Sequence, residues 1–78
     1  MKKNTLDALN ESVSNRDRIR KIILDNILSK EKKAIRLNLV YITYNFSSRS
    51  VLIEYYVEDD EYPNVEMSFD ELANFMKK

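Results

Sequence analysis

The chain has 78 residues, and its 13 Lys and Arg balance 13 Asp and Glu, so its formal net charge is zero. It contains no Cys, His, Trp or Gly. These absences exclude a disulfide framework, a thiol nucleophile, the usual transition-metal ligands and the glycine-rich loops that hold phosphates. The sequence therefore predicts one small globular domain spanning residues 1–78, and we expect it to hold neither a cofactor nor a metal.

No part of the sequence predicts insertion in a membrane. No run approaches the roughly 20 apolar residues that a bilayer-spanning helix needs. Residues 1–3 look like the start of a secretory signal, but polar residues such as Asn4 and Asp7 stand where its apolar stretch would follow. We therefore expect a cytoplasmic protein without membrane contact.

The neutral total hides a separation of charge along the chain. Residues 1–49 carry 11 basic and 5 acidic side chains, a net charge of +6, whereas residues 50–78 carry 2 basic and 8 acidic, a net charge of −6. One interpretation is that the two halves attract each other in the folded chain. The other is that one sign of charge is presented to a partner.

Residues 4–30 carry the spacing of amphipathic helix. Their apolar side chains recur at steps of three and four residues, which puts one stripe on one face: Leu6, Leu9, Val13, Ile19, Ile23, Leu24 and Ile27. Such a stripe normally packs on the core of its own chain. It could also form the seam of a homodimer, through Leu6, Leu9, Val13, Ile23 and Ile27, since a small domain gains from burial against a partner.

Two arginines decide whether this segment is one helix or two. Arg16 and Arg20 would interrupt the apolar stripe of a continuous helix, unless their stems lie over the apolar surface with the charged ends in water. Alternatively the helix breaks, and Ser14 caps a second one. We favour the break, with a short helix over residues 4–12 and a longer one over 15–30.

Residues 35–46 and 51–58 are rich in β-branched and aromatic side chains and predict a pair of strands. Residues 47–50 then form a four-residue hairpin loop on a type I turn, since the chain has no Asn-Gly. The resulting register makes one face apolar, with these pairs: Phe46 and Val51, Tyr44 and Ile53, Ile42 and Tyr55, Val40 and Val57. A slip by one residue would send the whole set to the opposite face.

A third strand and a further helix follow. Val65 and Met67 alternate with polar residues, which indicates a short strand, and Pro63 before it suits the edge of a sheet. Ser68 and Glu71 have the spacing of a capping box at the start of a helix. The predicted fold class is therefore α+β: a three-stranded antiparallel meander, with an N-terminal helix or helix pair and a C-terminal helix packed on one face.

The opposite face of the hairpin is a candidate binding surface. In the expected register Tyr41 lies opposite Tyr56, and Glu54 and Glu58 share their face. Tyrosine is enriched at the energetic centres of interfaces, because it adds apolar area with a polar tip. The plainer interpretation is ordinary cross-strand pairing within the sheet.

The acidic run of residues 58–61 follows the second strand. It is either a solvated connection between strands or a patch that matches a basic surface on a partner. A calcium loop is a third interpretation, although the run lacks the ligand spacing and the glycine of an EF-hand.

We expect a protein without enzymatic activity, since the chain has neither His nor Cys, two of the usual side chains of acid–base and nucleophilic catalysis. Its partner would be a larger protein with a basic surface. The most concrete form of this hypothesis is an inhibitor encoded by a phage or mobile element, which blocks a host or defence enzyme as a DNA mimic or as anti-CRISPR proteins do. Its expected docking residues are Tyr41, Tyr56, Glu54, Glu58, Asp59, Asp60 and Glu61.

The alternative hypothesis is a nucleic-acid-binding transcriptional regulator. The basic residues of the predicted second helix would contact phosphates: Arg16, Arg18, Arg20 and Lys21. However, Asp17 stands among them and no second recognition helix is visible in the sequence. A solvated helix face is the ordinary fate of such a segment, so nucleic acid is the less favoured partner.

Overall fold

The computed structural model describes residues 4–77, so the signal-like start at residues 1–3 lies outside the described residues. Within that range the elements follow one another in this order: α1 (Thr5–Val13), α2 (Asp17–Ser29), β1 (Ala34–Arg36), β2 (Val40–Asn45), β3 (Ser50–Tyr55), β4 (Val65–Ser68) and α3 (Phe69–Met76). The strands form an antiparallel sheet in the order β1-β2-β3-β4. No helix in this part of the chain is long and apolar enough to cross a membrane.

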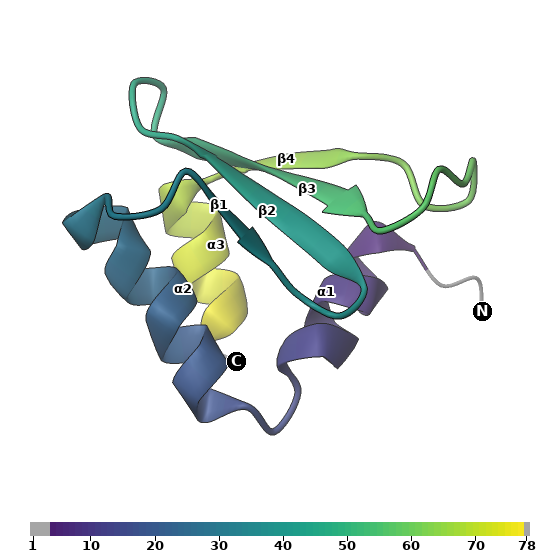
Figure 1. Cartoon of the computed structure of the whole chain (residues 1–78), viewed down its shortest axis with the longest axis horizontal. Helices are drawn as coiled ribbons and strands as arrows, with labels where there is room; N and C mark the ends of the chain where they lie inside the picture. The colour runs from purple at the N-terminus through teal and green to yellow at the C-terminus, as the bar shows by residue number, and fades with distance from the viewer. Residues whose placement is uncertain (1–3, 78) are drawn as a thin grey trace.

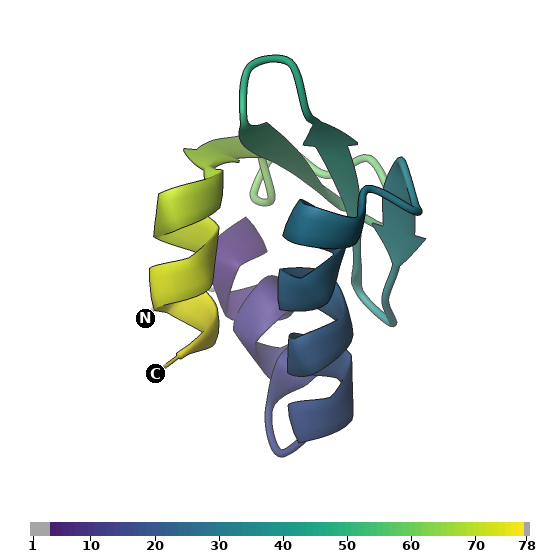
Figure 2. The same ribbon diagram turned by 90° about the vertical axis from the view of Figure 1, so that its left-hand side faces the viewer.

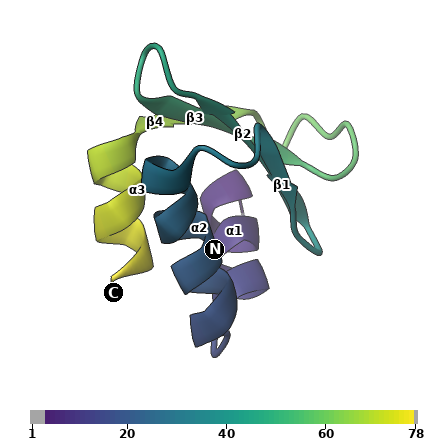
Figure 3. The same cartoon turned by 60° about the vertical axis from the view of Figure 1, so that its left-hand side comes forward.

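The molecule has two layers. In Figure 1 the sheet lies above and the helices below, and the turned views in Figures 2 and 3 show the same arrangement. The α+β class and the placement of the helices on one face are therefore confirmed. The core lies between the layers and is made of apolar side chains from both: Ala8, Leu9, Val13, Ile23, Val40, Ile42, Tyr44, Val51, Ile53, Met67, Phe69, Leu72 and Met76.

The N-terminal segment is a pair of helices, as the two arginines indicated, but its break differs in detail. Ser14 is extended and ends α1, and Asn15 has a left-handed φ of 58°. The residue before α2 is Arg16, whose side chain makes no capping hydrogen bond. The prediction that Ser14 caps the second helix is therefore wrong, because the chain needs these residues for the turn between α1 and α2.

The apolar stripe of α1 and α2 faces the chain's own sheet. Leu9, Val13 and Ile23 are at most 1% exposed. Leu6 and Ile27 are half-buried against the same core. A homodimer through the predicted seam would have to pull the first three side chains out of the core, so the seam is not available on the folded chain.

The sheet has a fourth strand that the sequence analysis missed. The segment predicted as one strand over residues 35–46 is split into β1 and β2, which pair with each other. Between them the chain turns at residues 37–39, where the Leu37 N–H donates to the Val40 carbonyl at 2.8 Å. The Leu39 N–H donates to the Ser12 hydroxyl of α1 at 3.3 Å. This tether to a distant helix holds a turn that alternation along the strand does not reveal.

The hairpin of β2 and β3 is present, but the predicted register is wrong by two residues. Asn45 pairs with Ser50, so the loop comprises residues 46–49. Phe46 leaves the strand and lies 5.9 Å from the Phe69 ring of α3, measured between ring centroids. A shift of two keeps each side chain on its expected face, and the apolar face still points to the helices.

The C-terminal elements agree with the sequence analysis. β4 begins at Val65. The Ser68 hydroxyl accepts from the Glu71 N–H and the Glu71 carboxylate accepts from the Ser68 N–H, both at 3.0 Å. This capping box satisfies two donors at the start of α3 and fixes the turn from sheet to helix.

Candidate functional site

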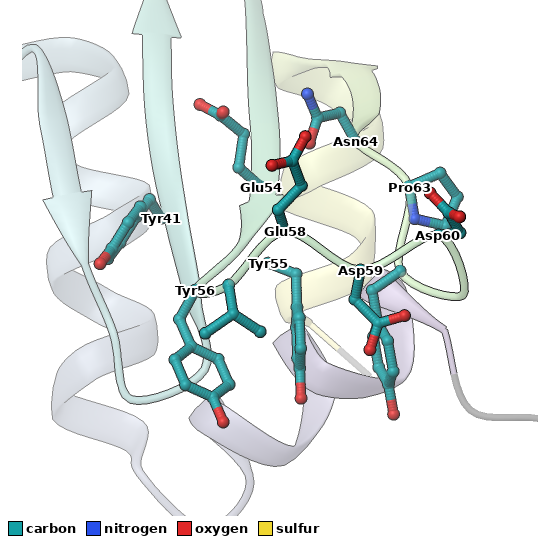
Figure 4. Close-up of a pocket in the computed structure, with 11 residues that line it drawn as sticks. Tyr41, Glu54, Tyr55, Tyr56, Glu58, Asp59, Asp60, Pro63 and Asn64 are labelled. Atoms are coloured by element: carbon teal, nitrogen blue, oxygen red, sulfur yellow. The ribbon is translucent and has the colours of Figure 1, made fainter.

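The loop of residues 56–64 joins β3 to β4 and encloses an open hollow of about 500 Å³ at one end of the sheet. We call it the tyrosine–acid hollow, and its lining residues are Tyr41, Glu54, Tyr55, Tyr56, Val57, Glu58, Asp59, Asp60, Tyr62, Pro63 and Asn64 (Figure 4). Six of the seven predicted docking residues therefore line one hollow. The seventh, Glu61, is exposed in the same loop but does not line it.

The predicted pairing of Tyr41 with Tyr56 is wrong. In the observed register Tyr41 lies opposite Glu54, and β3 ends at Tyr55. Tyr56 follows the strand, and its N–H donates to the Leu39 carbonyl at 2.8 Å. The two tyrosines still line the same hollow, because the loop after β3 stays beside the sheet.

Three tyrosines form an aromatic cluster in the hollow. The Tyr55 and Tyr62 rings are stacked, with centroids 3.9 Å apart and planes at 14°. The Tyr56 ring meets Tyr55 edge-on, with centroids 4.8 Å apart. Tyr56 remains 46% exposed, so this cluster offers aromatic surface to a partner.

The surroundings of Tyr55 raise the pKa of its phenol. Its pKa lies above the ordinary value of 10, first because burial disfavours the phenolate and then because Tyr56, Tyr62 and Asp59 lie close by.

Backbone and side-chain contacts fix the loop in place. The Thr5 hydroxyl at the start of α1 donates to the Pro63 carbonyl. The Asp59 carboxylate accepts from the Glu61 N–H, and the Asp59 carbonyl accepts from the Tyr62 N–H, each at 2.9 Å. The hollow is thus held from α1 and from within the loop, and Asp59 has a structural role there.

The carboxylates and the phenols are segregated within the hollow. Figure 4 shows the carboxylates of Glu54 and Glu58 pointing to the opposite side from the hydroxyls of Tyr55 and Tyr56. The side chains of residues 58–61 are all exposed. Four consecutive acids in solvent, with a fifth on the strand, attract cations and repel phosphates.

The open face of the sheet continues from the hollow toward β1. Arg36, Tyr41 and Glu54 form one row across three strands. The Arg36 guanidinium carbon lies 5.1 Å from the centroid of the Tyr41 ring. A second hollow of about 350 Å³ covers this row, together with Ala34 and Thr43. The surface is therefore acidic and aromatic at the loop and carries a cation at its far edge.

The basic residues of the alternative hypothesis lie at the start of α2 and before it. Arg16, Arg18 and Lys21 are exposed, whereas Arg20 is half-buried. The Arg20 Nε donates to the Val13 carbonyl at 3.1 Å and so serves the packing of α1 on α2. One of the four predicted phosphate contacts is thus engaged within the chain.

Sequence reasoning missed two residues of the hollow. Tyr55 was assigned to the covered face of the sheet, which is confirmed because it packs against the core, but it was not expected at the binding surface. Tyr62 was not considered. The signal that would have found them is that Tyr55, Tyr56 and Tyr62 fall in a span of eight residues that also contains the acidic run. Within residues 4–77, no group of three or more His, Cys, Asp or Glu side chains is placed to hold a metal ion.

The comparisons with known proteins give no relative from which a role could be transferred. No family model, curated protein or solved structure matches this chain. The chemistry of the surface must therefore be inferred from its own geometry.

Proposed function

We propose that this protein binds a larger protein through the tyrosine–acid hollow and performs no chemistry of its own. The observation that carries the proposal is the convergence of Tyr41, Tyr56 and the carboxylates of Glu54, Glu58 and Asp60 on one open hollow. Exposed tyrosine supplies contact area at small cost in side-chain entropy. The carboxylates select a partner of opposite charge and speed its approach.

The partner that this surface fits is a protein with a basic groove, such as one that handles nucleic acid in the cytoplasm. Carboxylates that occupy such a groove compete with phosphates for the same cations. This is the chemistry of an inhibitor that imitates DNA, and it is the concrete form of the function we propose. A phage or other mobile element is the source that best suits such an inhibitor.

The test is affinity capture from host cells with the native protein and with the double variant Glu58→Lys and Asp60→Lys. Both side chains are exposed, and Asp59 is left intact because its carboxylate holds the loop. We expect the partner to bind the variant about tenfold more weakly or worse, which corresponds to roughly 1.4 kcal/mol or more. The difference between the two should shrink as salt is added.

The matched control is Asp25→Lys with Glu31→Lys, which makes the same change of charge at exposed positions away from the hollow. If both double variants capture the partner equally weakly, the loss reflects net charge and not the hollow. If neither double variant changes the capture of the partner, the hollow is ruled out as the docking surface. Retention of labelled DNA in a band-shift assay, lost in Arg18→Glu with Lys21→Glu, would instead favour the nucleic-acid hypothesis.

A further inference from the structure

We infer that the tyrosine–acid hollow binds the guanidinium group of an arginine from the partner protein. This inference rests on the proposed function and names the chemical group that the hollow recognises. It follows from three observations: the ring geometry of the tyrosines, the position of the carboxylates, and a guanidinium that already lies on one of the tyrosines.

The aromatic cluster offers electron-rich surface to a cation. The faces of tyrosine rings carry negative potential and attract a cation within about 6 Å of the centroid. In the stacked pair of Tyr55 and Tyr62, each ring uses one face against the other. Tyr56 meets Tyr55 edge-on and is 46% exposed, so much of its own surface is open to a partner.

The hollow also carries carboxylates. Glu54, Glu58, Asp59 and Asp60 line the same hollow as Tyr56. In Figure 4 the Glu54 and Glu58 carboxylates point to the side of the hollow opposite to the Tyr55 and Tyr56 hydroxyls. Tyr41 and Glu54 both line the hollow and are direct cross-strand partners, so a cation on the Tyr41 ring also lies near a carboxylate. A volume of about 500 Å³ leaves room for a long side chain with part of its backbone.

The shape of the cation is indicated by the protein itself. Arg36 places its guanidinium carbon 5.1 Å from the centroid of Tyr41, and Tyr41 also lines the hollow. A guanidinium is planar, stacks on aromatic faces and donates paired hydrogen bonds to a carboxylate, whereas an ammonium is a strongly hydrated point charge. A site of tyrosine faces beside carboxylates therefore favours arginine over lysine.

The test titrates the isotope-labelled protein with three small probes and follows its backbone amide signals by NMR. The probes are N-acetyl-arginine amide, N-acetyl-lysine amide and the neutral N-acetyl-citrulline amide. We expect the arginine probe to shift the amides of residues 54–64 and of Tyr41, and to bind at least threefold more tightly than the lysine probe. The citrulline probe, which has nearly the same shape without the charge, should cause little shift.

Matched variants locate the site. Glu58→Gln and Glu61→Gln remove the same charge from the same loop, but only Glu58 lines the hollow. We expect Glu58→Gln and Tyr56→Leu each to weaken the arginine probe at least threefold, and Glu61→Gln to leave it within a factor of two. The amide spectrum of each variant without probe reports whether the fold is intact.

Three results would overturn the inference: equal shifts from arginine and citrulline, shifts that lie outside the hollow, or equal losses in the two glutamine variants. Its failure is separate from failure of the proposed function. If the arginine probe binds but the double variant Glu58→Lys and Asp60→Lys captures the partner as well as the native protein does, the docking function fails and the guanidinium site stands. If capture depends on that pair but the probe does not bind, the guanidinium site fails and the docking function stands.

Discussion

The two faces of the sheet use similar residues for different purposes. On the covered face Ile53 is fully buried, and Tyr44 is 5% exposed with its hydroxyl donating to the Ile23 carbonyl of α2 at 2.8 Å. On the open face Tyr41 is half-buried opposite Glu54, and Tyr56, just after the strand, is 46% exposed. A tyrosine whose hydroxyl is bound within the core holds layers together, whereas one left at the surface is available to a partner.

The largest expected effect comes from adjacent residues on opposite faces of β3. Ile53→Ala removes a fully buried side chain and should lower the free energy of unfolding by about 3 kcal/mol. Leu52→Ala, on the open face, should cost about 1 kcal/mol, since Leu52 is only half-buried. Urea unfolding at equilibrium measures both losses. Equal losses would mean that the open face is packed as tightly as the covered one.

Alkaline pH should lower the free energy of unfolding through the buried phenol of Tyr44. Burial raises the pKa of the Tyr44 phenol from 10 to about 12. Below pH 10 the phenol is protonated in both the folded and the unfolded chain, so its contribution is complete. Between pH 10 and 12 the unfolded chain releases the proton while the folded chain retains it. The free energy of unfolding should therefore fall across this window, by roughly 2–3 kcal/mol in total.

Tyr44→Phe isolates that contribution from the other tyrosines, which both proteins share. The variant should lose about 1 kcal/mol at neutral pH with the hydrogen bond to Ile23. Its stability should then fall less steeply above pH 10 than that of the native chain. Parallel stability curves for the two proteins would contradict the role given to the Tyr44 phenol.

Local signals account for the elements that the sequence predicted well. The capping box of Ser68 and Glu71 joins residues three apart, and its pattern is complete in the sequence. The register of the hairpin is different, because Phe46 leaves the strand to reach Phe69 of α3. The turn between β1 and β2 depends on Ser12, which lies 27 residues from its partner Leu39. Contacts of that range are decided by packing and leave no local pattern.

In the candidate site, too, the sequence predicted what is local and missed what depends on distant contacts. The acidic residues were found because a run of carboxylates must remain in water wherever the chain places it. The stack of Tyr55 and Tyr62 was missed because it depends on the path of the loop between them. That path is held by the hydrogen bond from Thr5 to Pro63, which are 58 residues apart.

The smallest expected effect is a difference in stability between variants of two tyrosines of the hollow. Tyr56→Leu should change the free energy of unfolding by no more than about 0.5 kcal/mol, because the ring is 46% exposed. Tyr62→Leu removes the stack on Tyr55 and should cost about 1 kcal/mol. Thermal unfolding of both variants gives the comparison. A larger loss at Tyr56 than at Tyr62 would make Tyr56 a structural residue like Tyr44, and the exposed ring would then no longer be free for a partner.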